Sequence, residues 1–197
     1  MARWQGRAGM RGFTLMELLA VVVIIGILAA TASPMFIQVM RDRRVNRAAM
    51  EITGMYRLAR SRSLGRGTAV LVRWNGTDGI FSMREAVSIT SPEASVLSSN
   101  CTTTPWGTPT SDREVTFLQF GSTPDALAQV EMVDITGTQQ PTVDICFTPR
   151  GRSFVRYNIA GNFVPLTEVP RVNVINQRTG MVRTVMIPPN GAARLAL

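Results

Sequence analysis

The sequence predicts an α+β fold in which a long N-terminal hydrophobic helix is packed on a C-terminal antiparallel β-sheet domain. Residues 18–40 contain no charged side chain, and as a helix this run is long enough to cross a bilayer core of about 30 Å. Beyond residue 65, short apolar segments alternate with turn-forming residues, which is typical of antiparallel sheet. A chain of 197 residues therefore holds an N-terminal extension and one globular domain.

The segment in front of the hydrophobic run is short, polar and basic. Residues 1–12 carry Arg3, Arg7 and Arg11, which favours an N-terminus on the cytoplasmic side and export of the remainder. A plain membrane anchor fits this arrangement. A cleaved secretory signal also fits, because Ala30-Thr31-Ala32 forms a small-x-small site at the end of an apolar stretch.

Neither interpretation explains Glu17, a carboxylate inside the apolar run. A charge at the centre of a membrane helix costs about 2.5–3.5 kcal/mol on insertion scales and less near an end, so such a residue usually has a partner. If the chain were cut between Gly12 and Phe13, the new α-amine of Phe13 would lie one helical turn from Glu17. The opposite charges would then meet in a poorly hydrated setting, either within a chain or between neighbouring chains. The alternative is a polar residue tolerated near a helix end, with its carboxylate reaching the membrane interface.

The string Gly12-Phe13-Thr14-Leu15-Met16-Glu17-Leu18-Leu19 closely resembles the class III leader-peptide site of type IV prepilins and type II secretion pseudopilins. The resemblance implies cleavage after Gly12 and N-methylation of Phe13. It also implies an assembly salt bridge, in which Glu17 of an incoming subunit meets the amine of Phe13 on a subunit already in the filament. Pro34 falls where these pilins commonly carry a helix-bending proline, and a proline kinks a helix because it deletes a backbone hydrogen bond.

The helix is expected to continue to about Leu64 as an amphipathic segment. Apolar or small residues recur there at three- and four-residue spacing, namely Val45, Ala48, Ala49, Ile52, Met55, Tyr56 and Ala59. Gly65-Arg66-Gly67 is a stop signal for the helix. The chain is thus expected to divide into a leader at 1–12, a transmembrane and assembly helix at 13–40, its amphipathic continuation at 41–64 and a β-rich periplasmic domain at 65–197.

The β domain is expected to begin with a hairpin. Thr68–Trp74 alternates weakly and ends at Asn75-Gly76, a strong turn signal, with Ile80–Arg84 as the returning strand. Residues 86–112 are dense in Ser, Thr and Pro and are expected to form a long loop that carries Cys101. Further strands are expected at Val115–Phe120, Val130–Ile135, Val143–Phe147, Ser153–Asn158, Arg171–Asn176 and Val182–Ile187, the last two joined by a hairpin at residues 177–180.

A later segment carries a second resemblance. The stretch Cys146-Phe147-Thr148-Pro149-Arg150-Gly151-Arg152, between two expected strands, resembles the strand, Phe-x-Pro-x-Gly, strand segment of GspH/FimT-type minor pilins. The closing hairpin, with Thr179-Gly180 before Met181-Val182-Arg183, is also similar to the C-terminal end of that family. The resemblance implies a low-copy minor subunit, although Pro-x-Gly turns between strands are common in other proteins too.

The residue inventory argues against catalysis. The chain has no histidine, so the commonest general base and the commonest nitrogen ligand for metals are both missing. Its acidic residues show no paired motif, and no glycine-rich phosphate loop is present. We expect no enzyme activity, no cofactor and no metal site. Cys101 and Cys146, the two cysteines, cannot complete a zinc site alone and in an exported domain are expected to form one disulfide.

The basic residues are all arginine, and the formal net charge is +8. A cluster directly after the hydrophobic run could neutralise DNA phosphates or form a solvated or interfacial patch, and it comprises Arg41, Arg43, Arg44 and Arg47. Some FimT-like minor pilins bind DNA, so DNA uptake is a second possibility that the resemblance implies. The more exposed candidates for contacts with DNA or a partner are Arg171, Arg178, Arg183 and Arg194.

Taken together, these features predict a minor pilin that helps to prime and assemble a type IV pilus within a tip complex. The alternatives are a minor pseudopilin of a type II secretion system and a tip module that binds DNA or a surface. The resemblance implies other minor pilins and a major pilin, a prepilin peptidase that also methylates, and an inner-membrane assembly platform as partners. The expected location is the bacterial inner membrane, with a single pass and a periplasmic C-terminal domain, and then a pilus or pseudopilus.

Overall fold

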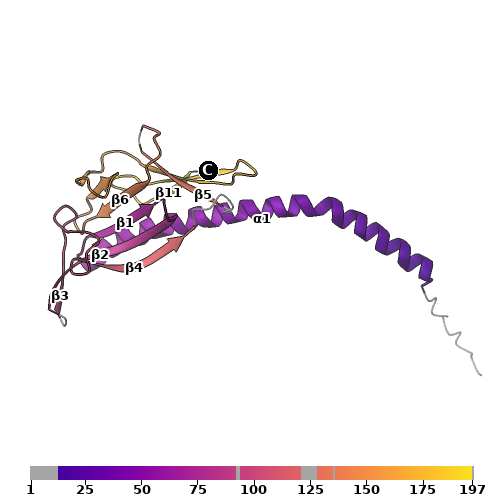
Figure 1. The fold of residues 1–197 in the computed structure, drawn as a ribbon, viewed down its shortest axis with the longest axis horizontal. Helices are drawn as coiled ribbons and strands as arrows, with labels where there is room; N and C mark the ends of the chain where they lie inside the picture. The colour runs from indigo at the N-terminus through magenta and orange to yellow at the C-terminus, as the bar shows by residue number, and fades with distance from the viewer. Residues whose placement is uncertain (1–12, 92–93, 121–127, 135, 197) are drawn as a thin grey trace, which may run out of the picture. The chain divides into compact units, whose positions relative to one another are not determined.

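The computed structural model describes residues 13–91, 94–120, 128–134 and 136–196 (Figure 1). Within these residues lie one α-helix, α1 (Leu15–Arg66), and eleven β-strands. The chain divides into two compact units, Met1–Met40 and Arg41–Leu197. The first half of α1 and the domain that contains its second half are therefore described separately. The α+β class expected from the sequence is confirmed.

Helix α1 ends where the glycine-rich stop signal predicts. The N–H of Gly67 donates to the carbonyl of Ser63 over 3.1 Å, and Gly67 has a φ of 70°, a left-handed conformation that glycine adopts without a steric penalty. Pro34 lies inside the helix and has no N–H to donate to the preceding turn. That this proline bends the helix stays a prediction.

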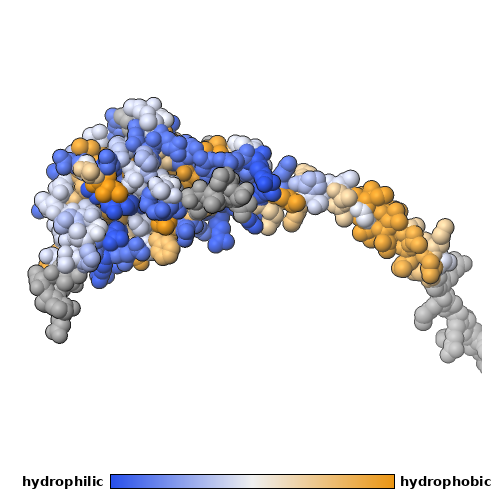
Figure 2. Space-filling view, in the orientation of Figure 1, coloured by the Kyte–Doolittle hydropathy of each residue, from blue (hydrophilic) through white to orange (hydrophobic). Residues whose placement is uncertain are grey.

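The first half of α1 exposes its apolar side chains. Phe13 is 78% exposed, Leu18 is 62% exposed and Leu28 is 61% exposed. Figure 2 shows the continuous apolar surface that such residues form on this part of the helix. The helix contains an 18-residue stretch that is apolar enough to cross a membrane, and none of that stretch is buried in the structure. An exposed apolar surface of this extent needs lipid or other helices as its surroundings.

The second half of α1 buries one stripe of side chains in the domain. The stripe consists of the residues whose spacing predicted it, Val45, Ala48, Ala49, Ile52, Met55, Tyr56 and Ala59. Thr53 and Ser63 are buried with them, and their hydroxyls donate to the carbonyls of Ala49 and Thr148 over 2.7 and 3.3 Å. The apolar face predicted from the sequence is therefore the face of the helix that packs in the core of the domain.

The first sheet is antiparallel throughout. Its strands are β1 (Val70–Asn75), β2 (Ile80–Ser91), β3 (Ala94–Leu97), β4 (Asp112–Gln119), β6 (Thr142–Phe147), β7 (Ser153–Arg156) and β8 (Val164–Pro165). Their order is β3-β2-β1-β6-β7-β8, and β4 pairs with β2. Trp74 of β1 lies opposite both Phe81 of β2 and Val143 of β6, and all three side chains join the core.

The second sheet shares no strand with the first. It contains β5 (Gln129–Val133), β9 (Arg171–Ile175), β10 (Val182–Met186) and β11 (Arg194–Ala196), in the order β11-β10-β9-β5. Val130, Met132, Val172, Val174 and Val185 point inward from these strands and join the same core as the helix stripe. The helix stripe therefore packs in one core with both sheets.

Polar contacts attach α1 to the second sheet and its flanking segments. Asn176 Nδ2 and Thr179 Oγ1 donate to Asp42 Oδ1 over 2.9 and 2.7 Å, and Arg183 Nε donates to Asn46 Oδ1 over 2.6 Å. Further along the helix, Arg57 Nε donates over 2.8 Å to the carbonyl of a residue just before β11 (Ala193). The helix and the second sheet are thus aligned from the β9–β10 turn to the C-terminal strand.

A second, smaller apolar cluster covers the other face of the first sheet. It consists of Ala69, Leu71, Ala86, Cys101, Trp106 and Cys146. Cys101 and Cys146 form a disulfide that joins the loop after β3 to β6, and a disulfide of this kind stabilises a domain by about 2–4 kcal/mol. The indole N–H of Trp106 donates to the carbonyl of Cys101 over 2.9 Å within the same loop, so the disulfide joins the loop to the sheet and the hydrogen bond stabilises the loop itself.

The expected loop over residues 86–112 is wrong in its first half. Strand β2 continues to Ser91, and β3 occupies Ala94–Leu97, so that only residues 98–111 connect β3 to β4. The Ser and Thr content favoured a loop, but Val87 is 3% exposed and pairs with Leu97, so burial and cross-strand pairing decided the outcome. Strands β8 and β11, with 2 and 3 residues, are too short to leave a periodic pattern.

The strand boundaries moved only slightly elsewhere. Strand β1 starts later than the expected Thr68, β4 starts earlier than the expected Val115, and β7 ends before the expected Asn158. Strands β5, β6, β9 and β10 match their expected positions within one or two residues at each described end. Ile135, the expected end of one strand, lies outside the described residues.

The end of α1 is attached to the first sheet through a buried carboxylate. Glu85 of β2 is fully buried and accepts hydrogen bonds from Arg62 of α1 (3.2 Å) and Arg113 of β4 (2.6 Å), while Arg66 Nε lies 2.7 Å away. Burial by itself raises the pKa of Glu85, but the hydrogen bonds from Arg113 and Arg62 outweigh this effect and hold the pKa below its ordinary value.

The lowered pKa predicts how stability depends on pH. A carboxylate whose pKa is lower in the folded state stabilises the protein fully above its ordinary value of about 4.3, and this contribution is lost as the pH falls further. Removing one partner of a buried charge pair costs about 3–5 kcal/mol, so we expect Glu85→Gln to lower the free energy of unfolding at pH 7 by at least about 2 kcal/mol.

The measurement is urea unfolding of the full chain in micelles between pH 7 and pH 3, with Glu114→Gln as the matched control because Glu114 is a half-exposed carboxylate on the same sheet. The wild type and the control should lose stability on acidification, and Glu85→Gln should show a flatter pH dependence. Equal pH dependence in all three proteins would contradict the role assigned to Glu85.

Candidate functional site: the start of α1

The helix begins in a hydrogen-bonded box made by Thr14 and Glu17. The N–H of Glu17 donates to Thr14 Oγ1 over 3.2 Å, and Glu17 Oε2 accepts from the N–H of Thr14 over 3.4 Å. This is the reciprocal arrangement of a capping box, in which the residue before the helix and the third helical residue each satisfy a backbone N–H of the other. The carboxylate also lies in the first turn of α1, where the helix dipole favours negative charge.

The box gives Glu17 a partner inside its own chain. We expected either an assembly partner or exposure at the interface, and the structure adds local capping to these two interpretations. The sequence contained the signal for it, because Thr14-Leu15-Met16-Glu17 has the threonine–glutamate spacing of a capping box in front of an apolar run. Thr14 is thus a site residue that the sequence analysis missed.

Phe13 lies just outside the capped helix. It precedes Thr14, has no helical conformation and exposes 78% of its surface. Gly12, the other side of the expected cleavage point, lies outside the described residues.

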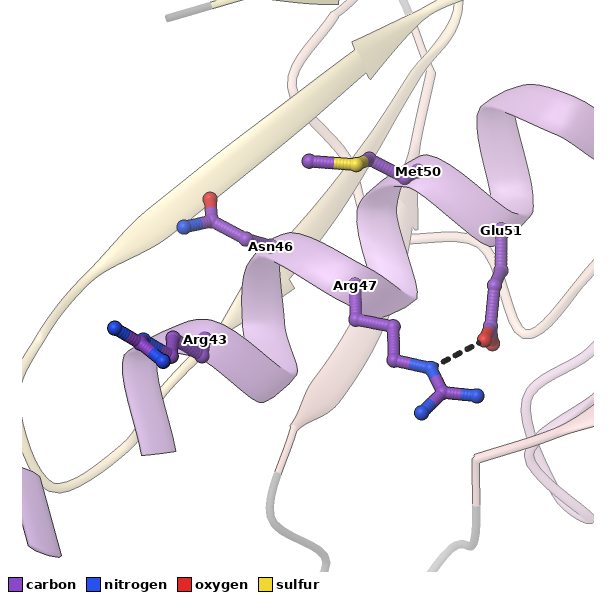
Figure 3. A pocket seen from close by; sticks show the side chains of 5 residues that line it. All are labelled: Arg43, Asn46, Arg47, Met50 and Glu51. Carbon is purple, nitrogen blue, oxygen red and sulfur yellow. Dashed lines mark hydrogen bonds and ion pairs between the residues drawn. The ribbon is translucent and has the colours of Figure 1, made fainter. Parts of the chain in front are cut away.

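The arginine cluster after Met40 lies at the start of the domain. Arg43, Arg44 and Arg47 are exposed, and Arg41 is half-buried. Arg47 Nε pairs with Glu51 Oε1 over 2.8 Å, as Figure 3 shows. A shallow hollow of about 480 Å³ on the helix surface is lined by Arg43, Asn46, Arg47, Met50 and Glu51.

The four arginines proposed for DNA or partner contacts do not form one surface. Arg178 lies exposed in the β9–β10 turn, and Arg183 faces the helix, where it binds Asn46. Arg171 and Arg194 lie elsewhere, in register with Met186 on the two strands that flank it. The structure therefore brings Arg178 and Arg183 to the start of the domain's helix and places the other two on the outer face of the second sheet.

The described residues contain no cluster of three or more metal-ligating side chains. Their buried carboxylates, Glu85, Asp112 and Asp144, are each paired with arginine. These pairs hold strands and helix together, and they leave no unpaired acid and base facing a common space.

One comparison with known proteins matches the start of the chain. Residues 7–33 match a family model described as the prokaryotic N-terminal methylation motif. The crystal structure of the type IV minor pilin FimU from Pseudomonas aeruginosa aligns with a TM-score of 0.42 and 15% sequence identity, over 79% of this chain and 90% of that chain. None of the curated proteins compared matches the chain.

The capping box makes a local prediction. Thr14→Ala removes the side-chain acceptor of the Glu17 N–H, which also donates to the carbonyl of Thr14 over 3.1 Å, and loss of such a cap costs about 1 kcal/mol. We therefore expect the amide of Glu17 to exchange with solvent about fivefold faster in micelles. Thr14→Ser, which keeps the hydroxyl, should exchange at the wild-type rate. If Thr14→Ala also exchanges at the wild-type rate, the box does not hold the helix start in solution.

Proposed function

We propose that this chain is a minor subunit of a type IV pilus, of the GspH/FimT type, that is processed between Gly12 and Phe13 and helps to prime filament assembly. The observation that carries the proposal is the combination at its N-terminus. A methylation motif at residues 7–33 overlaps the start of a helix whose apolar first half is exposed. A helix with this composition is suited first to a bilayer and then to a bundle of similar helices.

The assignment as a minor subunit rests on the later segment of the chain. The Phe147-to-Gly151 stretch, which resembles the GspH/FimT type, forms the tight β6–β7 turn, in which the N–H of Gly151 donates to the carbonyl of Thr148 over 2.9 Å. Gly151 has a φ of 80°, which explains why glycine stands there. A minor pseudopilin of a type II secretion system would have the same N-terminal chemistry, and it is the alternative within this class.

The proposed cycle begins with membrane insertion. The arginines of the leader keep the N-terminus cytoplasmic, and a prepilin peptidase removes residues 1–12 and methylates Phe13. The new amine then becomes available to a carboxylate. In the unassembled subunit Glu17 accepts from Thr14, and in the filament it would exchange this weak neutral donor for the charged amine of Phe13 on a neighbouring subunit. The proposed role is structural, and it involves no catalysis.

The four C-terminal arginines by themselves do not support a binding role for DNA. Duplex recognition needs several phosphate contacts on one surface, and Arg171 and Arg194 lie apart from Arg178 and Arg183 in the described domain. Binding to an abiotic or cellular surface stays an untested alternative for the same domain.

The proposed processing predicts the mature N-terminus. Intact mass and terminal peptide sequencing of protein extracted from the membrane of its host should show a chain that begins at Phe13 and carries one methyl group on its α-amine. A chain that begins at Ser33 would instead indicate an ordinary secreted domain, and an intact Met1 would indicate a simple anchor. Either of these results would refute the filament subunit.

The assembly salt bridge predicts a separate defect. Glu17→Gln keeps an oxygen that can accept from the N–H of Thr14 but removes the negative charge. We expect normal processing and normal membrane insertion. The amount of this chain in sheared filaments should fall at least about tenfold, because unpairing a charge in a poorly hydrated site costs about 3–5 kcal/mol. Glu51→Gln is the matched control, since Glu51 pairs only with exposed Arg47. Equal incorporation of both variants would remove Glu17 from the assembly step.

A further inference from the structure

The length of the uncharged helix fixes where the first charges of the domain lie. Residues 18–40 are helical throughout, and at about 1.5 Å per residue they rise about 35 Å. The hydrocarbon core of a bilayer is about 30 Å thick, and each headgroup layer adds about 5–7 Å. If α1 crosses the membrane, the residues that follow Met40 therefore lie at the headgroup layer on the domain's side.

Basic side chains are concentrated at this level. Residues 41–47 contain four arginines and a single acid, Asp42. Asp42 is turned toward the domain, where it accepts from Asn176 and Thr179 over 2.9 and 2.7 Å. Arg43 and Arg44 point into solvent and have no acidic partner among the described residues.

The fold brings a distant arginine to the same level. Arg178 lies in the turn between Asn176 and Thr179, the two residues that bind Asp42, and it is exposed. The apolar side chain directly before this group, Met40, is 41% exposed, whereas Met50, which is 61% exposed, lies about 15 Å further along the helix. In Figure 3, Met50 extends from the same stretch of helix as Arg43 and Arg47.

We propose that Arg43, Arg44 and Arg178 form a basic belt that binds the anionic phospholipid headgroups of the leaflet on the domain's side of the membrane. The inference rests on the membrane anchoring proposed above. A guanidinium donates two parallel hydrogen bonds to a phosphate, and each basic residue near an anionic membrane surface favours association by about fivefold. Met40, directly before these arginines, suits the boundary between headgroups and acyl chains, and this amphipathic setting favours lipid over nucleic acid.

The belt has a functional consequence for the unassembled subunit. It holds the domain against the bilayer while the helix is in the membrane, and it must release the headgroups when the subunit is extracted. Lipid binding of this kind weakens as salt rises, because charges beyond about one Debye length are screened. Extraction of the subunit from the membrane therefore requires that these electrostatic contacts with the headgroups be broken.

The domain offers a matched set of control arginines. Arg150, Arg171 and Arg194 are exposed but lie toward the other end of the helix. Arg194 follows Ala193, which binds Arg57, whereas the belt lies beside Asp42 and Asn46. Eleven helical steps from residue 46 to residue 57 correspond to about 16 Å, well beyond one Debye length of about 8–10 Å.

The test uses the full chain reconstituted in bilayers of phosphatidylcholine with spin-labelled phosphatidylcholine or phosphatidylglycerol as probe. Flotation with vesicles of phosphatidylcholine alone checks the anchoring first. Electron spin resonance then measures the preference of the lipid shell for phosphatidylglycerol. We compare the wild type, the belt variant Arg43→Gln/Arg44→Gln/Arg178→Gln, and the control variant Arg150→Gln/Arg171→Gln/Arg194→Gln. All three proteins keep the leader arginines, so any contribution from the other leaflet is common to them.

We expect all three proteins to float with the vesicles. Only in the belt variant should the preference of the lipid shell for phosphatidylglycerol fall, by at least about threefold. The preference of the wild type should fall between about 0.05 M and 0.5 M salt. Equal preferences in the belt and control variants would overturn the belt while leaving the anchoring intact. Failure to float would refute the anchoring itself. Retention of a DNA duplex by the reconstituted wild type, lost only in the belt variant, would reassign these arginines to nucleic acid.

Discussion

The two sheets share no strand, and the apolar stripe of α1 from Val45 to Ala59 is what joins them. Its small residues let the helix approach both sheets closely, and Tyr56 and Ile52 fill the space between. Because the core is formed around this stripe, the polar contacts at either end of the helix can act as alignment points. Asp42 fixes the second sheet near the start of the domain's part of α1, and Glu85 fixes the first sheet near the end of α1.

Much of this architecture could be predicted from local sequence patterns. The spacing of apolar residues predicted the buried stripe, and most strands appear where alternation and turn residues placed them. The failures have a common cause, because they depend on partners far along the chain. Strand β3 forms since β2 is long enough to pair with it, and the very short β11 forms since β10 offers an edge. A segment of three residues is too short for its hydrophobic pattern to indicate that a neighbouring strand edge will pair with it.

The candidate functional residues also include some that local sequence patterns could identify and others that depend on distant partners. Glu17 could be identified from its chemistry, because a carboxylate in an apolar run needs a partner, and the capping role of Thr14 was present in the spacing but overlooked. The arginines could not be sorted from sequence. Whether Arg183 faces the helix or the solvent depends on the register of β10, and a shift of one residue would exchange the two faces. Only the pairing of Arg183 with Val174 decides this.

The contacts of Asp42 have a consequence for biogenesis. Its partners Asn176 and Thr179 lie 134 and 137 residues further along the chain, and the carbonyl that binds Arg57 comes 136 residues after it. During synthesis the helix emerges first and the segments that align it emerge last. Until then the second half of α1 lacks these contacts with the domain, and contacts of such long range form slowly. A prematurely terminated chain would form the helix yet never make these contacts, so the fold itself distinguishes finished chains from incomplete ones.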